Sequence, residues 1–348
     1  MIQLSDFIGV AVLYNYSLQL IKGEAQDILA ENGVVQCAHA ISNALKSEGI
    51  NVELAPITEE AEQTLSCYQP DKWVIYNLAE GFSGRLFEEA RIAWLLETSG
   101  YHFTGNGGAA IAHSTNKALT KSLLVNSGLD TPAWWLFNSA DSVSKFENYP
   151  FPLFVKPVAE DASQGIGYES VVSNYSTLRD RVAYLAEHYC QSVLVEEFIP
   201  GREINAAVWG DPLELLPLAE IDFREFDRPE QKIVNFSAKW QEDSFEYHHT
   251  PSICPADLSP SLKRRVSQAA LRAVEIIGAQ GYARVDIRLS NQGVPYILEV
   301  NCNPDISPEA GFFHAVEQTG LQYQDMARKI LSLARRLSDV YNPARIPE

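Results

Sequence analysis

The sequence predicts an α/β protein, with α+β character in its later part, built from two or three domains. Its 348 residues exceed the roughly 100–200 residues that one domain usually holds. The first third alternates apolar, strand-like runs with helical patterns, which is typical of an α/β layer. A hydrophobic content of 46% with 10% aromatic residues is ordinary for a protein with buried cores.

The first 105 residues predict a small α/β layer. Four elements are expected there: strands near 7–14 and at 73–78, and helices near 33–48 and 84–98. Gly49 and Gly100 stand where helices commonly end in glycine. Asp6 precedes the first apolar run and no basic segment opens the chain, so this run is interpreted as a buried strand and not as a signal peptide.

The middle of the chain predicts a helix followed by a smaller sheet. The helix is expected from about 114 to 127, with Ser114 or Thr115 as its N-cap and Gly128 near its end. The further elements expected are strands at Leu153–Val155, Tyr168–Val172 and Val193–Phe198 and a helix at about 174–188.

The last part predicts further strands, a polar loop and a strand pair between two helices. The elements expected are strands within 201–250 with a loop most charged at Arg224–Gln231, a helix at about 260–278, strands at Ala283–Leu289 and Pro295–Asn301, and a helix at about 321–339. Gly278 or Gly281 ends the first of these helices, and Ser290–Gly293 turns between the two strands.

Charge and cysteine usage exclude several classes of protein. A formal net charge of −18 argues against a nucleic-acid partner, because phosphate backbones need clustered Lys and Arg. No apolar run approaches the roughly 18 residues of a membrane span. Five cysteines without a CxxC pair indicate free thiols in a reducing compartment, so a cytoplasmic protein is expected. A chain this acidic must gather its few cations, or metal ions, wherever it binds a phosphate.

The stretch ARVDIRLSNQGVPYILEVN, residues 283–301, carries the most specific pattern. Because side chains alternate along a strand, one face of the first strand holds Val285, Ile287 and Leu289 and the other holds Arg284, Asp286 and Arg288. On the return strand the apolar face is expected to hold Tyr296, Leu298 and Val300, and the opposite face Ile297, Glu299 and Asn301. A turn at 291–294 then places Asp286 opposite Glu299 and Arg284 opposite Asn301, about 5 Å apart.

Two carboxylates and an amide beside a guanidinium predict a site for a hard cation. Oxygen ligands of this kind suit magnesium, which takes the rest of its shell from phosphates and water. Without a cation, Asp286 and Glu299 at such a distance would repel one another or share a proton. The alternative is the solvated polar face of an ordinary hairpin.

Lysines and a flexible loop indicate a phosphate site. Lys156 ends an apolar strand, where a charge is out of place unless it points into a site. The following segment 159–167 contains glycines that let backbone amides turn inward around a phosphate. Lys117 and Lys239 are weaker candidates, because single lysines are usually solvated and a glycine between two strands is usually only a turn.

The segment VLVEEFIPGRE, residues 193–203, is typical of a nucleotide-binding strand exit. Its acids, backbone groups and Phe-Ile pair can surround an adenine, and Glu203 is placed for ribose hydroxyls. A simple hinge between domains with exposed acids is the alternative.

Together these motifs resemble the D-alanine–D-alanine ligase group of the ATP-grasp superfamily. The resemblance runs from about residue 73 to 325 through VIYNLAEG (74–81), FTGNGG (103–108), NKALTK (116–121), FVKP (154–157), VLVEEFIPGRE, SAKW (237–240), CPADL (254–258), GYARVDIRL and ILEVNCNP (297–304). It implies a three-domain ATP-grasp architecture. The domains would be an N-terminal Rossmann-like pre-ATP-grasp domain (1–105), a central lid domain (106–197) and a C-terminal domain (198–348) holding ATP, metal and acceptor.

The resemblance also implies roles for individual residues. Lys117, Lys156 and Lys239, with Ser163, Gln164 and Gly165 of the loop, would bind the phosphates of ATP, while Glu196, Glu197, Phe198 and Ile199 would surround adenine and Glu203 would bind ribose. Asp286, Glu299 and Asn301 would hold two Mg²⁺ ions, for which Mn²⁺ could substitute. Arg284, Lys239 and Ser163 would be the catalytic residues, with Arg284 stabilising a tetrahedral intermediate. A homodimer is expected by analogy with the family.

The chain departs from the family where the family binds amino acids. Glu80 replaces a substrate-site His, Trp240 a Tyr, and Asp305 a Gly, and Ala310 aligns with a substrate-binding Ser. The family's Ser-x-Glu element has no clear counterpart after the first strand. Glu80, Trp240, Arg284, Asp305 and Ser307 are therefore the expected substrate residues.

These departures resemble the mycosporine-glycine:serine/threonine ligase subgroup. The expected function is an ATP-dependent ligase that joins a phosphate-activated small-molecule acceptor to the amine of a free amino acid. Mycosporine-glycine with serine or threonine, giving an imine, is the preferred pair, and D-alanine–D-alanine or other dipeptide ligation is the alternative. A non-catalytic nucleotide-binding protein is a rival of another class. An NAD-type oxidoreductase is disfavoured because residues 14–24 lack a G-x-G-x-x-G turn.

Overall fold

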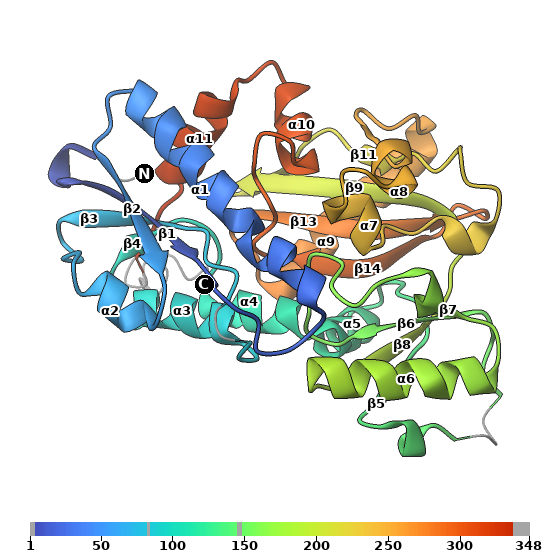
Figure 1. The fold of residues 1–348 in the computed structure, drawn as a ribbon. Helices are drawn as coiled ribbons and strands as arrows, with labels where there is room; N and C mark the ends of the chain where they lie inside the picture. The colour runs from blue at the N-terminus through green and yellow to red at the C-terminus, as the bar shows by residue number, and fades with distance from the viewer. Residues whose placement is uncertain (1–3, 82–83, 145–147, 337–348) are drawn as a thin grey trace.

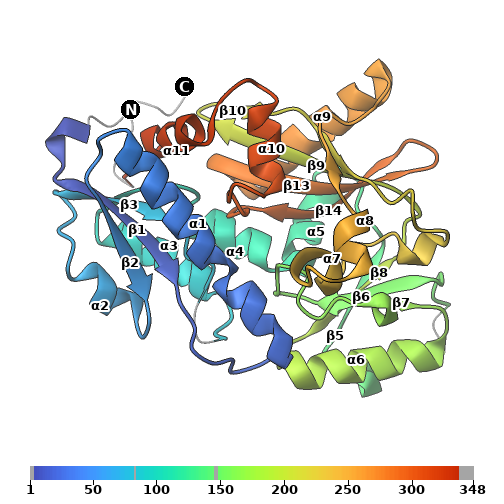
Figure 2. The ribbon, with the colours of Figure 1, turned by 45° about the horizontal axis from the view of Figure 1, so that its top comes forward.

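The computed structural model describes residues 4–81, 84–144 and 148–336, which form three β-sheets with helices packed on their faces (Figure 1). The sheets follow one another along the chain, as a view turned by 45° also displays (Figure 2). Among the residues that the structure describes, no helix combines the length and apolar character that crossing a membrane requires.

The first sheet is parallel and has the strand order β2-β1-β3-β4. Its strands are β1 (Gly9–Asn15), β2 (Val52–Ile57), β3 (Trp73–Asn77) and β4 (His102–Phe103), and its helices are α1 (Ile28–Ser47), α2 (Ala61–Leu65) and α3 (Glu88–Thr98). β1 and β3 are buried along their whole length, as parallel strands covered on both faces must be. The chain returns here near its end, where α11 (Tyr323–Ser332) packs on α1 and Arg335 pairs with Phe103.

The second sheet is antiparallel, in the order β5-β8-β6-β7, and is packed against α6. Its elements are β5 (Trp134–Phe137), β6 (Leu153–Pro157), β7 (Val171–Val172), α6 (Tyr175–Tyr189) and β8 (Val193–Glu197). Two helices, α4 (Gly108–Thr115) and α5 (Lys117–Asn126), lead into it.

The third sheet holds the longest strands, in the order β12-β11-β9-β13-β14, with β10 also pairing β9. Its strands are β9 (Gly201–Gly210), β10 (Leu213–Leu215), β11 (Ala219–Ile221), β12 (Ser252–Ile253), β13 (Gly281–Ser290) and β14 (Pro295–Asn301). The helices around it are α7 (Phe236–Trp240), α8 (Phe245–His249), α9 (Pro260–Ile277) and α10 (Gly311–Glu317). Short 3-10 helices lie at Leu4–Asp6, Ala25–Asp27, Ala140–Ser142, Tyr168–Ser170 and Pro229–Gln231.

The register of the β13–β14 hairpin agrees with the prediction at its functional end and differs beyond it. Asp286 lies opposite Glu299 and Arg284 opposite Asn301. A β-bulge after Asp286 then pairs Ile287 with Ile297, one residue out of the expected alternation. The predicted faces of β14 were therefore wrong in one respect, because Ile297 is fully buried in the core while Leu298 lines the cavity described below.

Several predicted boundaries were also wrong. Ser114 and Thr115 end α4 instead of capping the next helix, and the Asn116 side chain accepts the capping hydrogen bond from the Leu119 amide. The run predicted as a strand from Tyr168 begins as a 3-10 helix and becomes β7 only at Val171. α1 starts five residues before the predicted 33, α3 starts at Glu88, and α11 ends at Ser332. The rest of that predicted last helix, from residue 337, lies outside the described residues.

We expect Gly201→Ala to destabilise the third sheet strongly. A Cβ at Gly201 would lie 2.1 Å from the backbone oxygen of Leu289, on the strand that carries Asp286. Backbone cannot yield as a flexible side chain can, so the free energy of unfolding should fall by about 3 kcal/mol or more in urea titrations. Gly128→Ala is the matched control: its φ of +77° is also left-handed but its Cβ meets nothing within 4 Å, so it should cost only about 1 kcal/mol. Equal losses in the two variants would contradict the expectation.

Candidate nucleotide and metal site

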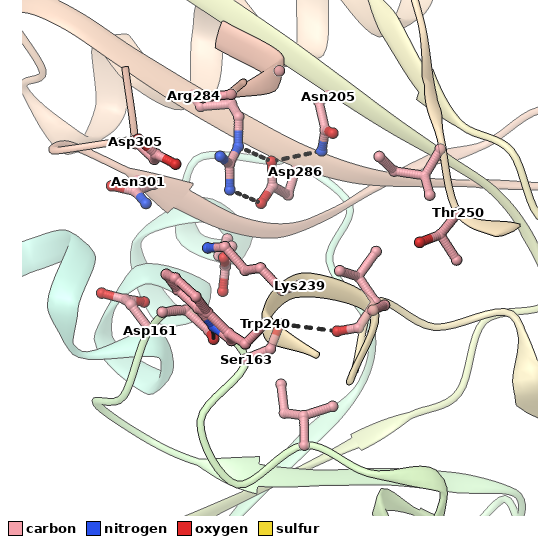
Figure 3. Close-up of a pocket in the computed structure, with 18 of the residues that line it drawn as sticks. Asp161, Ser163, Asn205, Lys239, Trp240, Thr250, Arg284, Asp286, Asn301 and Asp305 are labelled. Carbon is pink, nitrogen blue, oxygen red and sulfur yellow. Dashed lines mark hydrogen bonds and ion pairs between the residues drawn. The ribbon is translucent and has the colours of Figure 1, made fainter. Parts of the chain in front are cut away.

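A cavity of about 1030 Å³ lies where α1, the second sheet and the third sheet meet. Figure 3 shows its centre, where side chains from β9, β13 and the segment after β14 face those of α7 and of the loop at 159–167. The predicted site residues that line this cavity are Lys117, Lys156, Ser163, Glu196, Glu197, Phe198, Ile199, Glu203, Lys239, Trp240, Arg284, Asp286, Glu299, Asn301, Asp305 and Ser307. Segments far apart in the sequence thus meet at one place.

Three predicted residues lie elsewhere. Glu80 and Gln164 line an adjoining smaller cavity of about 110 Å³. Gly165 lines neither cavity, and a Cβ there would lie 2.9 Å from the Tyr189 ring of α6. Its carbonyl accepts a hydrogen bond from Arg181, which gives Gly165 a packing contact, and its contact with phosphate stays a prediction.

The Asp286 carboxylate is held in a fixed orientation by two neighbours (Figure 3). Arg284 donates from Nε and Nη2 to its two oxygens, at 2.7 and 2.8 Å, and Asn205 of β9 donates to Oδ1 at 2.8 Å. Paired donors of this fork geometry give strong, directional bonds. Oδ1 thus accepts two hydrogen bonds and Oδ2 only one, so Oδ2 keeps a lone pair that can still bind a cation.

Glu299 is ionised because cations surround it. Burial alone would raise its pKa, but Lys117, Lys156, Arg284 and Lys239 more than offset burial and lower the pKa to about 2. Lys117 Nζ lies 3.7 Å from the carboxylate and also contacts Asp161 at 2.7 Å. These carboxylates hold the pKa of Lys117 above its ordinary value, in spite of the burial that would lower it.

The donor set fits magnesium combined with phosphate better than it fits a metal held by protein alone. In the described part of the chain, no three His, Cys, Asp or Glu side chains gather closely enough to hold an ion. The hairpin offers two carboxylates in register and the amide of Asn301, which is the partial oxygen shell that magnesium accepts when phosphates and water complete it. Surplus positive charge from Lys117, Lys156 and Lys239 is then available to the phosphates.

Lys121 lies directly behind the site, and the sequence analysis did not single it out. Its Nζ lies 3.1 Å from Glu196, as does the Nζ of Lys156, so two lysines share one buried carboxylate. The two cations lower the pKa of Glu196 against the effect of burial. The signal was present in NKALTK, because Lys121 follows Lys117 by one helical turn and faces the same side of α5.

The segment 197–203, which begins at the last residue of β8, forms the predicted apolar wall of the cavity, and its Glu203 has an ion-pair partner that the sequence did not predict. Phe198 and Ile199 are buried side chains at the cavity. Glu203 forms an ion pair with Arg288 at 2.9 Å. Burial raises the pKa of Glu203 although Arg288 opposes this shift.

The loop at 159–167 and the segment around α7 are linked over the cavity. The Trp240 indole donates to the Ala162 carbonyl at 2.8 Å, and the Ser163 hydroxyl donates to the Val234 carbonyl at 3.0 Å. Ala162 and Ser163 both adopt left-handed φ angles, 55° and 59°, which non-glycine residues rarely do. Such conformations persist where their surroundings fix them, as these two hydrogen bonds do.

The smaller cavity is acidic. Glu80, Glu89 and Asp305 line it together with Arg284 and Lys239 of the larger cavity. Burial among protein atoms raises the pKa of Glu80 well above its ordinary value, and the neighbouring charge of Asp305 adds to the shift. Burial and then Asp161 raise the pKa of Glu89 to about 8. The cavity can therefore hold protonated carboxyl groups at neutral pH.

Comparisons with known proteins agree on one family. The sequence model described as D-ala D-ala ligase C-terminus matches residues 123–332. The uncharacterised protein y4sG of Sinorhizobium fredii is 31% identical over 76% of this chain and 75% of its own length. A D-alanine–D-alanine ligase of Nitrosospira multiformis is 28% identical over 94% of this chain and 97% of its own. The crystal structure of a D-alanine–D-alanine ligase from Bacillus anthracis complexed with ATP superposes with a TM-score of 0.69, at 21% identity, over 93% of this chain and 96% of that one.

The advantage in stability that Glu89→Gln has over the wild type should grow as pH rises from about 4.5 to about 8. In the folded state the pKa is about 8, against an ordinary value of 4.5, so the folded form keeps a proton that the unfolded form loses. The wild type therefore loses stability as pH rises from about 4.5 to about 8, by at most about 1.4 kcal/mol per pH unit. The variant lacks this loss, and its advantage in urea unfolding should be at least about 1 kcal/mol larger at pH 8 than at pH 5.5.

Glu317→Gln, on the exposed surface at the end of α10, is the control for removing one carboxylate. It should change stability equally at the two pH values. An advantage of Glu89→Gln that does not depend on pH would contradict the raised pKa.

Proposed function

The chain belongs to the D-alanine–D-alanine ligase family of ATP-grasp enzymes and is an ATP-dependent ligase, and we propose that it joins two small amino acids through a phosphate-activated carboxylate. The observation that carries this proposal is the hairpin register, which sets Asp286 opposite Glu299 and Arg284 opposite Asn301 at the wall of the large cavity. We further propose that the three sheets correspond to three domains and that the enzyme is a homodimer.

The nucleotide lies, in this proposal, along the lysines and the strand exit. Lys117, Lys156 and Lys239 neutralise the phosphates, Phe198 and Ile199 contact the adenine, and Glu203 accepts hydrogen bonds from the ribose. Asp286, Glu299 and Asn301 hold Mg²⁺, or Mn²⁺ in its place, and the ions supply positive charge to the transferring phosphoryl group. Positioning and charge neutralisation are what these side chains contribute, because phosphoryl transfer needs little else from a protein.

Arg284 stabilises the negative charge that develops when the amine attacks the activated carbon. Its guanidinium reaches both cavities and is already oriented by Asp286. A donor fixed before the reaction costs no reorganisation when charge appears, which is why such donors contribute strongly to rate. Lys239, whose ammonium lies 5.5 Å from the ring centroid of Trp240, adds a second cation that also lines both cavities.

The links over the cavity keep water from the activated carboxylate, which hydrolyses if it is exposed. Ser163 acts here by holding its loop to Val234. Trp240 holds α7 to Ala162 in the same way. We propose that these contacts open for substrate entry and for product release.

D-alanine is the first substrate to test, and mycosporine-glycine with serine or threonine is the second. The comparisons favour ligation of D-alanine over the mycosporine-glycine pair expected from the sequence, because ligases named for D-alanine recur among the relatives. The second pair is retained because the amino-acid end differs from the family's pattern at Glu80, Trp240, Asp305 and Ala310. These departures alter the walls of both cavities and leave the nucleotide side intact.

Release of ADP should depend on D-alanine. We expect ATP with Mg²⁺ and D-alanine alone to give steady ADP release in a coupled assay, and mycosporine-glycine with serine or threonine to give less. Asp286→Asn is the inactive control, because it removes a charge proposed to hold the metal. ADP release with the second pair alone would shift the assignment to that substrate class, and no release with either would overturn both and favour ligation of another pair of amino acids.

Arg284→Ala should lower turnover about 10²–10³-fold, as loss of one oxyanion donor does, while the Kd for ATP stays within about threefold. The reason is that Arg284 is proposed to act on the developing charge and not on the nucleotide. Arg272→Ala, which removes an exposed guanidinium on α9, is the control and should be neutral. Near-normal turnover of Arg284→Ala would overturn the assigned role.

A further inference from the structure

Lys121 is the most deeply buried lysine of the described chain and has no part in the proposed chemistry. It lies on α5 with no exposed surface and lines neither cavity. Lysine is almost never buried unless a partner compensates its charge. Burial and the nearby Lys156 lower its pKa to about 8, although Glu196 raises it. Burying a lysine this deeply costs free energy, so we expect Lys121 to have a role that offsets this cost.

The contacts of Lys121 join three elements. Its ammonium lies 3.1 Å from the Glu196 carboxylate of β8 and donates to the Thr131 hydroxyl at 2.7 Å. Thr131 in turn donates to the carbonyl of Ile297 on β14, also at 2.7 Å. α5 lies beside β6, β8 and β14 in both ribbon views (Figures 1 and 2). Lys121 is therefore held from two sides, and its ammonium does not line the cavity.

Lys156 is placed differently. It contacts the same Glu196 carboxylate at 3.1 Å, but it lines the large cavity and can reach a ligand there. Glu196 is only 2% exposed, so its charge needs a protein cation whatever else is bound. Two ammonium groups and the Glu196 carboxylate leave one positive charge over, which can serve other anions such as Glu299 and the phosphates of a ligand. The geometry decides which lysine carries it, because only Lys156 has access to the cavity.

We propose that Lys121 is a positioning residue, which neutralises Glu196 and so leaves the ammonium of Lys156 free for the phosphates of a bound nucleotide. This inference rests on the proposed nucleotide site. Without Lys121, Glu196 would be a buried carboxylate whose sole adjacent cation is Lys156, and separating that pair to bind phosphate would leave a charge uncompensated. The affinity lost would therefore be affinity for the phosphates of the nucleotide and not for its adenine.

The test compares binding of ATP with binding of adenosine, which shares the base and ribose but has no phosphates. Isothermal titration at pH 7 with magnesium chloride gives both Kd values, and their ratio isolates the contribution of the phosphates. In Lys121→Met we expect the preference for ATP over adenosine to fall about tenfold or more, the effect of losing one charged hydrogen bond. Lys263→Met, an exposed lysine on α9, is the control and should keep the wild-type ratio.

A double variant separates positioning from a merely structural role. Lys121→Met combined with Glu196→Gln removes the carboxylate that captures Lys156, so the ratio should return to within about threefold of the wild type. A structural role would lower the affinity for adenosine as much as that for ATP and would not be rescued. A double variant that stays as weak as Lys121→Met overturns the inference, since Lys121 would then act on the phosphates directly. If Lys121→Met does not fold, Lys121→Gln, uncharged but able to bond Thr131, takes its place with the same expected ratio.

The outcomes also separate this inference from the proposed function. A wild-type protein that does not prefer ATP to adenosine refutes the nucleotide site and the role of Lys121 together. A wild type that prefers ATP, with an uncharged Lys121 variant of unchanged ratio, refutes the role of Lys121 alone.

Discussion

Two carboxylates that face each other across one hairpin set the requirement that the rest of the site meets. Asp286 and Glu299 are fixed in register by the β13–β14 ladder, so they cannot separate to relieve their repulsion. Arg284 compensates the first carboxylate, and the second is compensated by lysines that arrive from other parts of the chain. Charged as well as apolar side chains therefore contact one another where the second and third sheets meet. The cavity between these sheets concentrates cations, although the protein has a net charge of −18.

Buried carboxyl groups have opposite pKa shifts in the two cavities because the charged groups around them differ. Glu299 has a pKa of about 2 since four cations outweigh its desolvation, whereas Glu89, near Asp161 and with Lys117 as the only cation that opposes the shift, has a pKa of about 8. The large cavity thus offers ionised oxygens to a cation, and the small one offers carboxyl groups that can keep their protons. The function proposed above, in which phosphates bind on one side and an attacking amine loses a proton on the other, would use both conditions.

The sequence predicted what depends on local periodicity and did not predict what depends on distant contacts. The pairing of Asp286 with Glu299 follows from the two-residue period and the turn at 291–294, and it was confirmed. The bulge that buries Ile297 was not predicted, because an extra residue in one strand leaves no mark in the alternation before it. Lys121 was missed although its spacing from Lys117 was visible, because only the fold brings Glu196 to it.

The amino-acid end could not be read from the sequence because its walls come from all three sheets and their connections. Gly33 of α1 illustrates this: a Cβ there would lie 2.4 Å from the ring of Trp240, so the absence of a side chain in the first layer leaves room for an indole from α7. Trp240 in turn bonds the loop that carries Ser163. A change in any of these three segments would move the others, whereas the register of Asp286 and Glu299 is fixed by ladder-paired strands. Ladder pairing thus fixes the carboxylates of the hairpin, while contacts with a loop and with α1 fix the position of Trp240.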